Sequence, residues 1–182
     1  PISSWTGSQP FNGIDHHWAQ DTFATCSDIV EVWDHNRTQP VHTYSWGCDS
    51  VNCVAFNPAE ACVLLTTASD RSICLYDVRQ EQPMRKVILA MKSNKAAWNP
   101  MEPFNFVVAN EDHNCYTFDM RKMNKPKMVH KDHQGAVMDI SYSPTGKEFV
   151  TGSYDKSIRI FGAQEGKSRE IYHTKRMQRV FC

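Results

Sequence analysis

The chain has 182 residues, of which 41% are hydrophobic. A chain of this length buries roughly 70% of its surface on folding, so the composition predicts a packed core and excludes a disordered protein. Its 20 Lys and Arg balance its 20 Asp and Glu, so any contact with nucleic acid must come from local patches of charge. No apolar run approaches the roughly 20 residues of a transmembrane helix, and we expect no membrane partner.

The cysteines are odd in number and irregularly spaced, and no C-x-x-C pair occurs. This usage is typical of reduced core thiols in a cytosolic or nuclear protein, and it argues against a disulfide framework or a zinc ribbon. The seven are Cys26, Cys48, Cys53, Cys62, Cys74, Cys115 and Cys182.

An aromatic residue at the end of an apolar stretch recurs through the chain, as Trp33, Tyr76, Phe118 and Phe161. The spacings between these residues are 43, 42 and 43. This period lies within the roughly 40 to 45 residues of a propeller blade and outside the tetratricopeptide, ankyrin and leucine-rich periods. The repeat predicts four copies of one structural unit.

The elements expected within each copy follow in chain order. A first strand ends at an aromatic residue before Asn57-Pro58, Asn99-Pro100 or Ser143-Pro144, because proline lacks a ladder donor. Runs rich in β-formers then cover 63–67, 106–108 and 148–151, and turns follow at Asp70, Asp112 and Asp155. Third strands are expected at 72–76 and 157–161, and fourth strands at 42–46, 86–90, 127–131 and 169–174.

The unit is therefore predicted to be a four-stranded antiparallel meander, and no window carries the 3.6-residue stripe of a helical solenoid. Blades are expected to end near residues 46, 90, 131 and 174, with 175–182 beginning a further blade. The pattern resembles the WD-repeat family, most closely in the fourth copy, where the family's His, strand-two Ser, turn Asp and strand-three Trp correspond to His133, Ser153, Asp155 and Phe161.

That resemblance implies an all-β, WD40-type β-propeller with about four consecutive blades present. In the family the four residues form a hydrogen-bonded tetrad, but Phe161 has no N–H to donate, and Gly47 stands where the second copy would carry its His. Four blades are few for a ring, and an open arc leaves unpaired strand edges. Because the chain starts at Pro1 without Met and ends in an apolar stretch, we expect it to be part of a seven-bladed ring.

More particular strings occur at 13–18, 98–102, 109–112, 142–149 and 172–178. Together they resemble the WD repeat and SOF domain-containing family. The resemblance implies a non-catalytic scaffold in the nucleolar small-subunit processome, which contains the U3 small nucleolar RNA and processes pre-ribosomal RNA. It also implies an alternative or coexisting role as substrate receptor of a cullin-RING ubiquitin ligase. The expected partners are processome proteins and the ligase adaptor, with direct contact to RNA left open, and the expected location is the nucleus and nucleolus.

Two consecutive copies end in an aromatic-Asp-x-Arg pattern, which matches the motif by which propeller receptors engage the ligase adaptor. The guanidinium offers a rigid fork of donors for carboxylates and carbonyls. The alternative interpretation is that each Arg pairs with a carboxylate of a neighbouring blade or caps its strand end. The candidate partner-binding residues are Tyr76, Asp77, Arg79, Phe118, Asp119 and Arg121.

Basic residues cluster between the blades, and on one side of the ring they would neutralise phosphates without reading sequence. A solvated charged face is the competing interpretation. The RNA-contact candidates are Lys122, Lys125, Lys127, Lys175, Arg176 and Arg179.

Neither a metal site nor an active site has a sequence signature. Adjacent His16 and His17 would point to opposite faces of a strand, with no third ligand at a useful spacing. A G-x-S-x-G elbow and a phosphate-binding glycine loop are both absent. We therefore expect no catalytic residue, metal, cofactor or small-molecule substrate, although an enzyme with a pocket in the central channel stays a third hypothesis.

Overall fold

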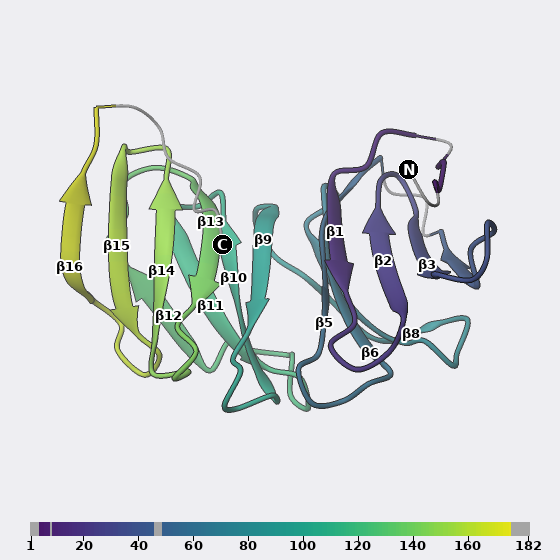
Figure 1. Cartoon of the computed structure of the whole chain (residues 1–182). Coiled ribbons are helices and arrows are strands. Elements are labelled where there is room, and N and C mark those ends of the chain that lie inside the picture. The colour runs from purple at the N-terminus through teal and green to yellow at the C-terminus, as the bar shows by residue number, and fades with distance from the viewer. Residues whose placement is uncertain (1–3, 8, 46–48, 176–182) are drawn as a thin grey trace.

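The computed structural model describes residues 4–7, 9–45 and 49–175. Within these residues the chain forms sixteen β-strands and no α-helix (Figure 1). The strands form four sheets of four strands, each a simple antiparallel meander. The prediction of an all-β fold built from four meanders is confirmed. No helix in the described part of the chain is long and apolar enough to cross a bilayer.

Each sheet is one blade, and the blades are numbered in chain order. Blade 1 contains β1 (Gly13–His16), β2 (Thr22–Cys26), β3 (Val30–Asp34) and β4 (His42–Tyr44). Blade 2 contains β5 (Val51–Phe56), β6 (Val63–Ala68), β7 (Ser72–Asp77) and β8 (Pro83–Ile88). Blade 3 contains β9 (Ser93–Trp98), β10 (Asn105–Asn110), β11 (Asn114–Asp119) and β12 (Met128–Lys131). Blade 4 contains β13 (Val137–Tyr142), β14 (Glu148–Ser153), β15 (Ser157–Gly162) and β16 (Ser168–His173).

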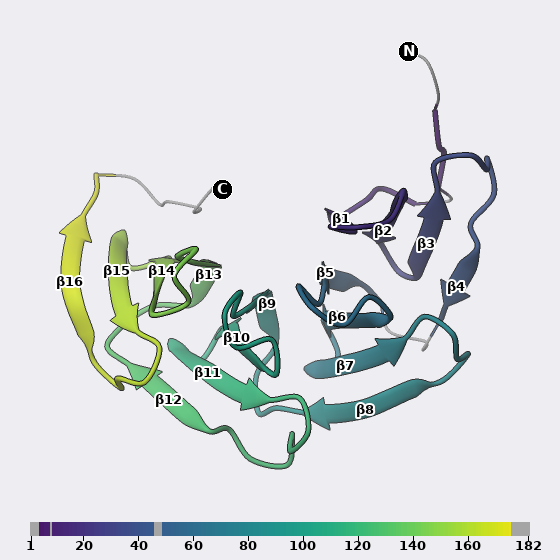
Figure 2. The same cartoon turned by 60° about the horizontal axis from the view of Figure 1, so that its bottom comes forward.

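The four blades stand side by side in an open arc (Figure 2). The first strand of each blade lies on the inner side of the arc, and the fourth strand lies on the outer edge. Because the meanders run in the same sense, the turns after the first and third strands meet at one rim, which we call the lower rim from its place in Figure 1. The turns after the second and fourth strands form the upper rim.

The turns between the second and third strands lie at the Asp residues where the sequence predicted them. The carboxylates of Asp70 and Asp155 accept hydrogen bonds from the backbone N–H groups of Ser72 and Ser157 at 3.0 and 2.8 Å. In blades 2, 3 and 4 the residue after the Asp adopts a left-handed conformation, with φ of 68°, 61° and 64°. The side-chain hydrogen bonds of Asp hold this tight turn without a glycine.

The hydrophobic core lies between the blades rather than within any one of them. Three clusters of buried side chains fill the three gaps between neighbouring sheets. Tyr76 and Trp33 belong to the buried set, and so do Phe118 and Phe161, each with at most 1% exposed surface. Tyr76, Phe118 and Phe161 each belong to one of these clusters and join successive blades, as propeller packing requires. Trp33 stacks on Phe23 of its own blade.

Polar clasps also join the blades at the lower rim. The side-chain oxygen of Asn57 accepts hydrogen bonds from two N–H groups of its own turn, while its amide nitrogen donates to the carbonyl of Pro103 in blade 3 at 2.8 Å. Asn99 repeats this arrangement and donates to Gly146 of blade 4 at 2.9 Å. The Asn-Pro pairs therefore mark more than strand ends: each Asn connects two neighbouring blades.

A second series of clasps lies at the start of the first strands. Asn52 donates to the carbonyl of Ser93 at 3.0 Å, and Asn94 donates to that of Val137 at 2.9 Å. Asn12 makes the corresponding bond to Val51 at 3.0 Å. Each blade is thus bonded to the next at both ends of its inner strand.

One predicted member of the tetrad is corrected by the structure. His133 approaches Asp155 at 3.0 Å through Nδ1, as expected, but its Nε2 lies 2.7 Å from Thr151. Ser153, the predicted partner, donates instead to the carbonyls of Gly135 and Ala136. Successive residues of a strand face opposite sides, so residues 151 and 153 share one face, and strand geometry alone does not choose between them.

Candidate protein-binding rim and basic loop

The two aromatic-Asp-x-Arg motifs end the third strands of adjacent blades and lie on the lower rim. Arg79 binds Asp77 through two hydrogen bonds, Nε to Oδ1 at 2.9 Å and NH2 to Oδ2 at 2.7 Å. Arg121 binds Asp119 in the same way, at 3.0 and 2.8 Å. Each arginine therefore pairs with the acid of its own motif and not with a carboxylate of a neighbouring blade, as one interpretation of the sequence held.

These ion pairs fix the direction of both guanidinium groups. The hydrogen bonds from the arginines lower the pKa of Asp77 and of Asp119, so both carboxylates stay ionised. The Arg79 and Arg121 side chains remain 72% and 62% exposed. Each acid thus holds one edge of a planar fork while the other N–H groups stay available in solvent.

The aromatic residues of the motifs have a different place. Tyr76 and Phe118 are buried in the clusters between blades, with 1% and 0% exposure. They anchor the strand that carries the fork and offer no surface to a partner. Phe104, which sequence reasoning missed, supplies an exposed ring instead, with the guanidinium carbon of Arg121 at 4.5 Å from its centroid. No sequence pattern indicates this contact, because it joins two turns of blade 3 that are separated along the chain.

The basic RNA-contact candidates fall into two separate groups. Lys122, Lys125 and Lys127 are exposed in the loop between β11 and β12, on the lower rim. Lys175 follows β16 and is exposed on the upper rim. Arg176 and Arg179 lie outside the described residues. The described members of the two groups therefore lie on opposite rims, because one group precedes the outer strand of its blade and Lys175 follows the outer strand of the next.

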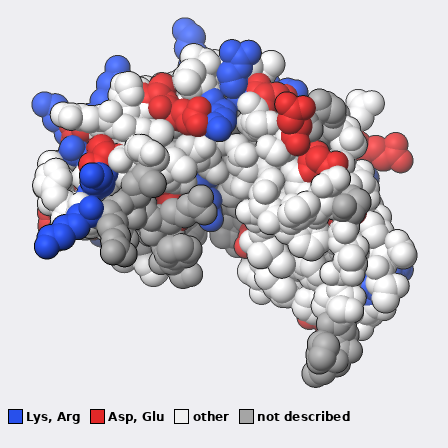
Figure 3. Space-filling model, turned by 90° about the horizontal axis from the view of Figure 1, so that it is seen from above, with Lys and Arg blue, Asp and Glu red and all other residues white. Residues whose placement is uncertain are grey.

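The view from above shows the upper rim. Along the outer edge of the arc, Lys and Arg alternate with Asp and Glu, and the described residues form no continuous basic surface on this face (Figure 3). Lys92 pairs with Glu111 at 3.0 Å, and Lys86 pairs with Asp70 at 3.3 Å. The lower loop between β11 and β12 is thus the stronger of the two candidates.

The structure also places the remaining titratable groups. His16 is exposed whereas His17 is buried, so the two imidazoles do point apart as predicted. Among the residues described, no group of three or more His, Cys, Asp or Glu side chains is arranged to hold a metal ion. Of the cysteines described, Cys26, Cys53, Cys74 and Cys115 are buried free thiols and Cys62 is partly exposed.

Comparison with known proteins agrees with this architecture. The family model "WD domain, G-beta repeat" matches residues 38–77 and 124–162. Both matches begin before the outer strand of one blade and end in the third strand of the next, so the sequence repeat is offset from the structural blade. This offset links consecutive blades through the chain itself.

Close relatives cover the whole chain. It is 56% identical over 182 residues to "DDB1- and CUL4-associated factor 13" of Homo sapiens and 53% identical over 182 residues to the protein of that name in Danio rerio. It is 53% identical over 180 residues to "Protein SOF1" of Saccharomyces cerevisiae. The chain spans 41% of the length of the two vertebrate relatives and 37% of the yeast protein. The chain therefore belongs to the WD-repeat proteins and, among them, to the WD repeat and SOF domain-containing family.

Proposed function

We propose that this chain is part of a non-catalytic scaffold of the nucleolar small-subunit processome, which supports pre-ribosomal RNA processing and formation of the small ribosomal subunit. The observation that carries the proposal is the similarity of almost the whole chain to yeast Protein SOF1. The fold supports it, because rims built of many turns present separate surfaces to several partners. In this role the protein recognises and holds other molecules and catalyses no covalent reaction. Its partners would be processome proteins, and it would need no cofactor.

Sedimentation tests the scaffold role. A tagged protein containing this chain is expected to be nucleolar and to sediment with large pre-ribosomal particles at moderate salt. Depletion of the protein is expected to reduce mature small-subunit RNA while large-subunit RNA is spared. A protein found only as a free species, with normal pre-ribosomal RNA processing after depletion, would contradict the proposal.

A second role is favoured by a specific observation, the two forks on one rim. As part of a substrate receptor of a cullin-RING ligase, the chain would contact the adaptor through Arg79 and Arg121. Each fork is oriented by its own Asp and keeps free N–H groups for carboxylates or carbonyls of a partner. The printed name of the human relative, "DDB1- and CUL4-associated factor 13", points in the same direction. The two roles are compatible with one another.

Copurification of the adaptor distinguishes recognition by the planar guanidinium from attraction by any positive charge. Arg79→Ala combined with Arg121→Ala is expected to abolish recovery of the adaptor, and the Lys variants at both positions are expected to restore it only weakly, because an ammonium cannot make two parallel bonds. Arg37→Ala is the matched control. Arg37 is an exposed arginine in the corresponding turn of blade 1, but it follows Asp34 by three residues and so does not belong to an aromatic-Asp-x-Arg motif. Unchanged recovery in the double variant would reject this assignment without affecting the scaffold role.

A further inference from the structure

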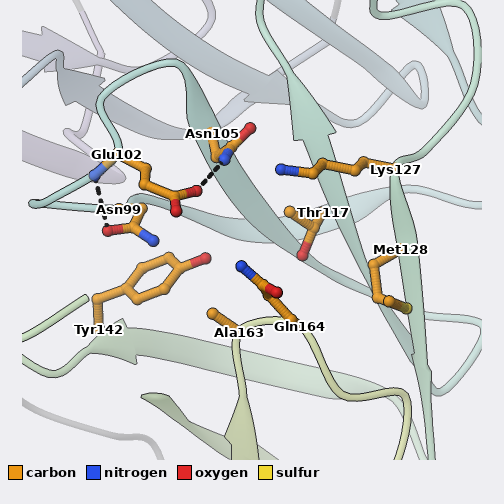
Figure 4. A pocket seen from close by; sticks show the side chains of 9 residues that line it. All are labelled: Asn99, Glu102, Asn105, Thr117, Lys127, Met128, Tyr142, Ala163 and Gln164. Carbon is orange, nitrogen blue, oxygen red and sulfur yellow. Dashed lines mark hydrogen bonds between the residues drawn. The ribbon is translucent and has the colours of Figure 1, made fainter. Parts of the chain in front are cut away.

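A cavity of about 250 Å³ lies between blades 3 and 4 at the lower rim. Its walls come from the turn after β9, the start of β10, the end of β13 and the turn after β15. Figure 4 shows the side chains that line it, with Glu102 and Asn105 on one side and Lys127 and Met128 on another. The cavity is adjacent in sequence to the basic loop, because Lys127 belongs to both.

Two buried polar atoms in the walls of this cavity have no partner in the described structure. Asn105 is 7% exposed, and its amide nitrogen donates to Glu102, but its Oδ1 receives no hydrogen bond. The hydroxyl of Tyr142 is buried as well, has no partner, and points into the space between the walls (Figure 4). A buried polar atom without a hydrogen-bond partner destabilises the folded protein, so two such atoms in the walls of one cavity point to a site that a ligand completes.

The hydroxyl of Tyr142 is protonated and can act as a hydrogen-bond donor in the cavity. Burial and the nearby Glu102 carboxylate raise the pKa of Tyr142, so its hydroxyl keeps its proton and can donate. Asn105 Oδ1 and the Glu102 carboxylate are acceptors only. Besides the hydroxyl of Thr117, the amides of Asn99 and Gln164 and the ammonium of Lys127, the cavity therefore offers two acceptors, on Glu102 and Asn105, and the donating hydroxyl of Tyr142.

Charge narrows the class of ligand. A guanidinium or ammonium from a protein partner would satisfy the acceptors, but it would bring a second cation into a cavity that already contains Lys127. Lys127 lies near enough to Asp119 to help lower the pKa of that carboxylate, which Arg121 already pairs, and Lys127 makes no ion pair within 4.0 Å among the described residues. A neutral ring with adjacent N–H donors, attached to an anionic group, satisfies Glu102 and Lys127 together.

We propose that this cavity binds the guanine base of an unpaired nucleotide in RNA. Guanine carries adjacent donors at N1 and N2, which match the carboxylate of Glu102 and the free oxygen of Asn105. Adenine and cytosine place an acceptor beside their donor on the same edge, and that acceptor would face the carboxylate. The side chains of Tyr142 and Met128 contact the base, and Lys127, with Lys125 of the same loop, binds the adjoining phosphate.

This proposal rests on the RNA contacts of the proposed scaffold and sharpens them. The lysines alone would bind any strand, whereas the cavity would select a single base. The site lies where the basic loop of blade 3 meets blade 4, so it exists only when both blades are assembled. A strand that follows the basic loop would thus be held at one fixed register.

Fluorescence anisotropy with labelled single-stranded RNA tests the proposal on the full chain. The probes are a ten-nucleotide uridine strand, the same strand with one central guanosine, and the same strand with one central adenosine. The guanosine strand is expected to bind about tenfold more tightly than the adenosine strand. The affinity for all three strands is expected to fall as the salt concentration rises, while the ratio of the affinities for the guanosine and adenosine strands stays constant.

Two variants locate the preference. Glu102→Gln keeps an oxygen for Asn105 but loses the carboxylate, so it is expected to abolish the preference for guanosine without changing the melting temperature. Tyr142→Phe keeps the ring and removes the hydroxyl, and is expected to reduce the preference severalfold. Glu81→Gln is the matched control, because Glu81 is an exposed carboxylate of the lower rim in the turn after β7, outside the cavity. It is expected to leave the preference intact.

The outcomes separate this site from the wider function. Equal binding of guanosine and adenosine strands that still requires Lys122, Lys125 and Lys127 would overturn the base site and keep RNA contact on the loop. No binding of any strand would reject both, and leave a scaffold that contacts proteins only. Glu102-dependent binding of an arginine peptide, with no response to guanosine, would show that the cavity takes a protein side chain instead.

Discussion

The imidazole of His17 takes the place in blade 1 that the carboxamide of Asn57 takes in blade 2. His17 Nδ1 accepts hydrogen bonds from the N–H groups of Ala19 and Gln20 at 3.0 and 2.9 Å, and Nε2 donates to the carbonyl of Ala61 in blade 2 at 3.0 Å. Asn57 does the same with Oδ1 and Nδ2. Two chemically different side chains thus make one clasp, because each carries an acceptor and a donor on opposite sides.

This equivalence predicts the effect of exchanging the two side chains. His17→Ala is expected to lower the free energy of unfolding by about 2 kcal/mol, since it leaves polar groups of two turns without partners. His17→Asn is expected to recover part of that loss, because the amide can accept and donate at the same place. Urea unfolding of both variants checks this, and equal losses would contradict the clasp.

Asn99 forms the corresponding clasp between blades 3 and 4. Asn99→Ala is expected to cost about 2 kcal/mol, and Asn99→Asp about half as much, because Asp keeps the acceptor for its own turn and loses only the donor to Gly146. Asn124→Ala, at an exposed position of the basic loop, is the control and is expected to be neutral. The measurement is again urea unfolding, and a neutral Asn99→Ala would exclude a stabilising role.

Gly146 receives that clasp and needs to be glycine for two reasons. Its φ is +66°, and a Cβ atom there would collide with Oδ1 of Asn99. Gly146→Ala is therefore expected to destabilise the protein by more than the roughly 1 kcal/mol of the left-handed conformation alone. Thermal unfolding of Gly146→Ala and of Gly166→Ala compares this site with a glycine of ordinary φ whose Cβ would meet only the carbonyl of Val129, at 3.3 Å. A harmless Gly146→Ala would contradict the close approach.

Trp33 makes a tetrad bond of the kind that the family's strand-three Trp makes, since its Nε1 donates to Thr25 at 2.9 Å in the buried core. Trp33→Phe is expected to cost about 1 to 3 kcal/mol, because the Thr25 hydroxyl loses its donor. Adding Thr25→Val removes the orphaned hydroxyl, so the double variant is expected to lose less than the sum of the two single variants. Strictly additive losses would show that this bond contributes nothing.

The buried imidazoles make stability depend on pH. Burial lowers the pKa of His133, although the bond to Asp155 opposes this, and burial lowers that of His130 as well. Asp132 and Arg159 also face His133, and they act in opposite directions. The unfolded chain therefore binds protons that the folded chain does not, and the free energy of unfolding is expected to fall as pH drops from 7.5 to 5.

The slope is at most about 1.4 kcal/mol per pH unit for each imidazole. His130→Gln is expected to flatten it, whatever its effect on stability at neutral pH. Denaturant unfolding at a series of pH values gives the slope directly. Stability that rises toward acid would contradict neutral histidines in the folded state.

Asp155 acts in a lower range of pH. Burial by itself would raise the pKa of this carboxylate, but hydrogen bonds from Ser157, Gln134 and His133 hold it well below its usual value. Its contribution to stability is therefore present above the ordinary Asp pKa near 3.9 and is lost as the pH falls below it. Asp155→Asn is expected to reduce the loss of stability between pH 4 and pH 2, measured by the same unfolding series.

Sequence alone determined the features that depend on short segments. The spacing of Trp33, Tyr76, Phe118 and Phe161 predicted the number of blades, because each ring takes the same position once in every repeat. The turns at Asp70 and Asp155 were predictable because the carboxylate bonds residues two places away. The sequence also showed the two aromatic-Asp-x-Arg motifs, but it did not predict that Arg79 and Arg121 each pair with the Asp of their own motif.

Only the tertiary structure decided which residues far apart in the sequence meet. It made Thr151 rather than Ser153 the partner of His133, gave His17 the role of Asn57, and placed Lys175 on the opposite rim from Lys127. The cavity beside Tyr142 likewise arises where two blades face each other. Such contacts depend on the distance and tilt between sheets, which are set by the packing of all the side chains between them.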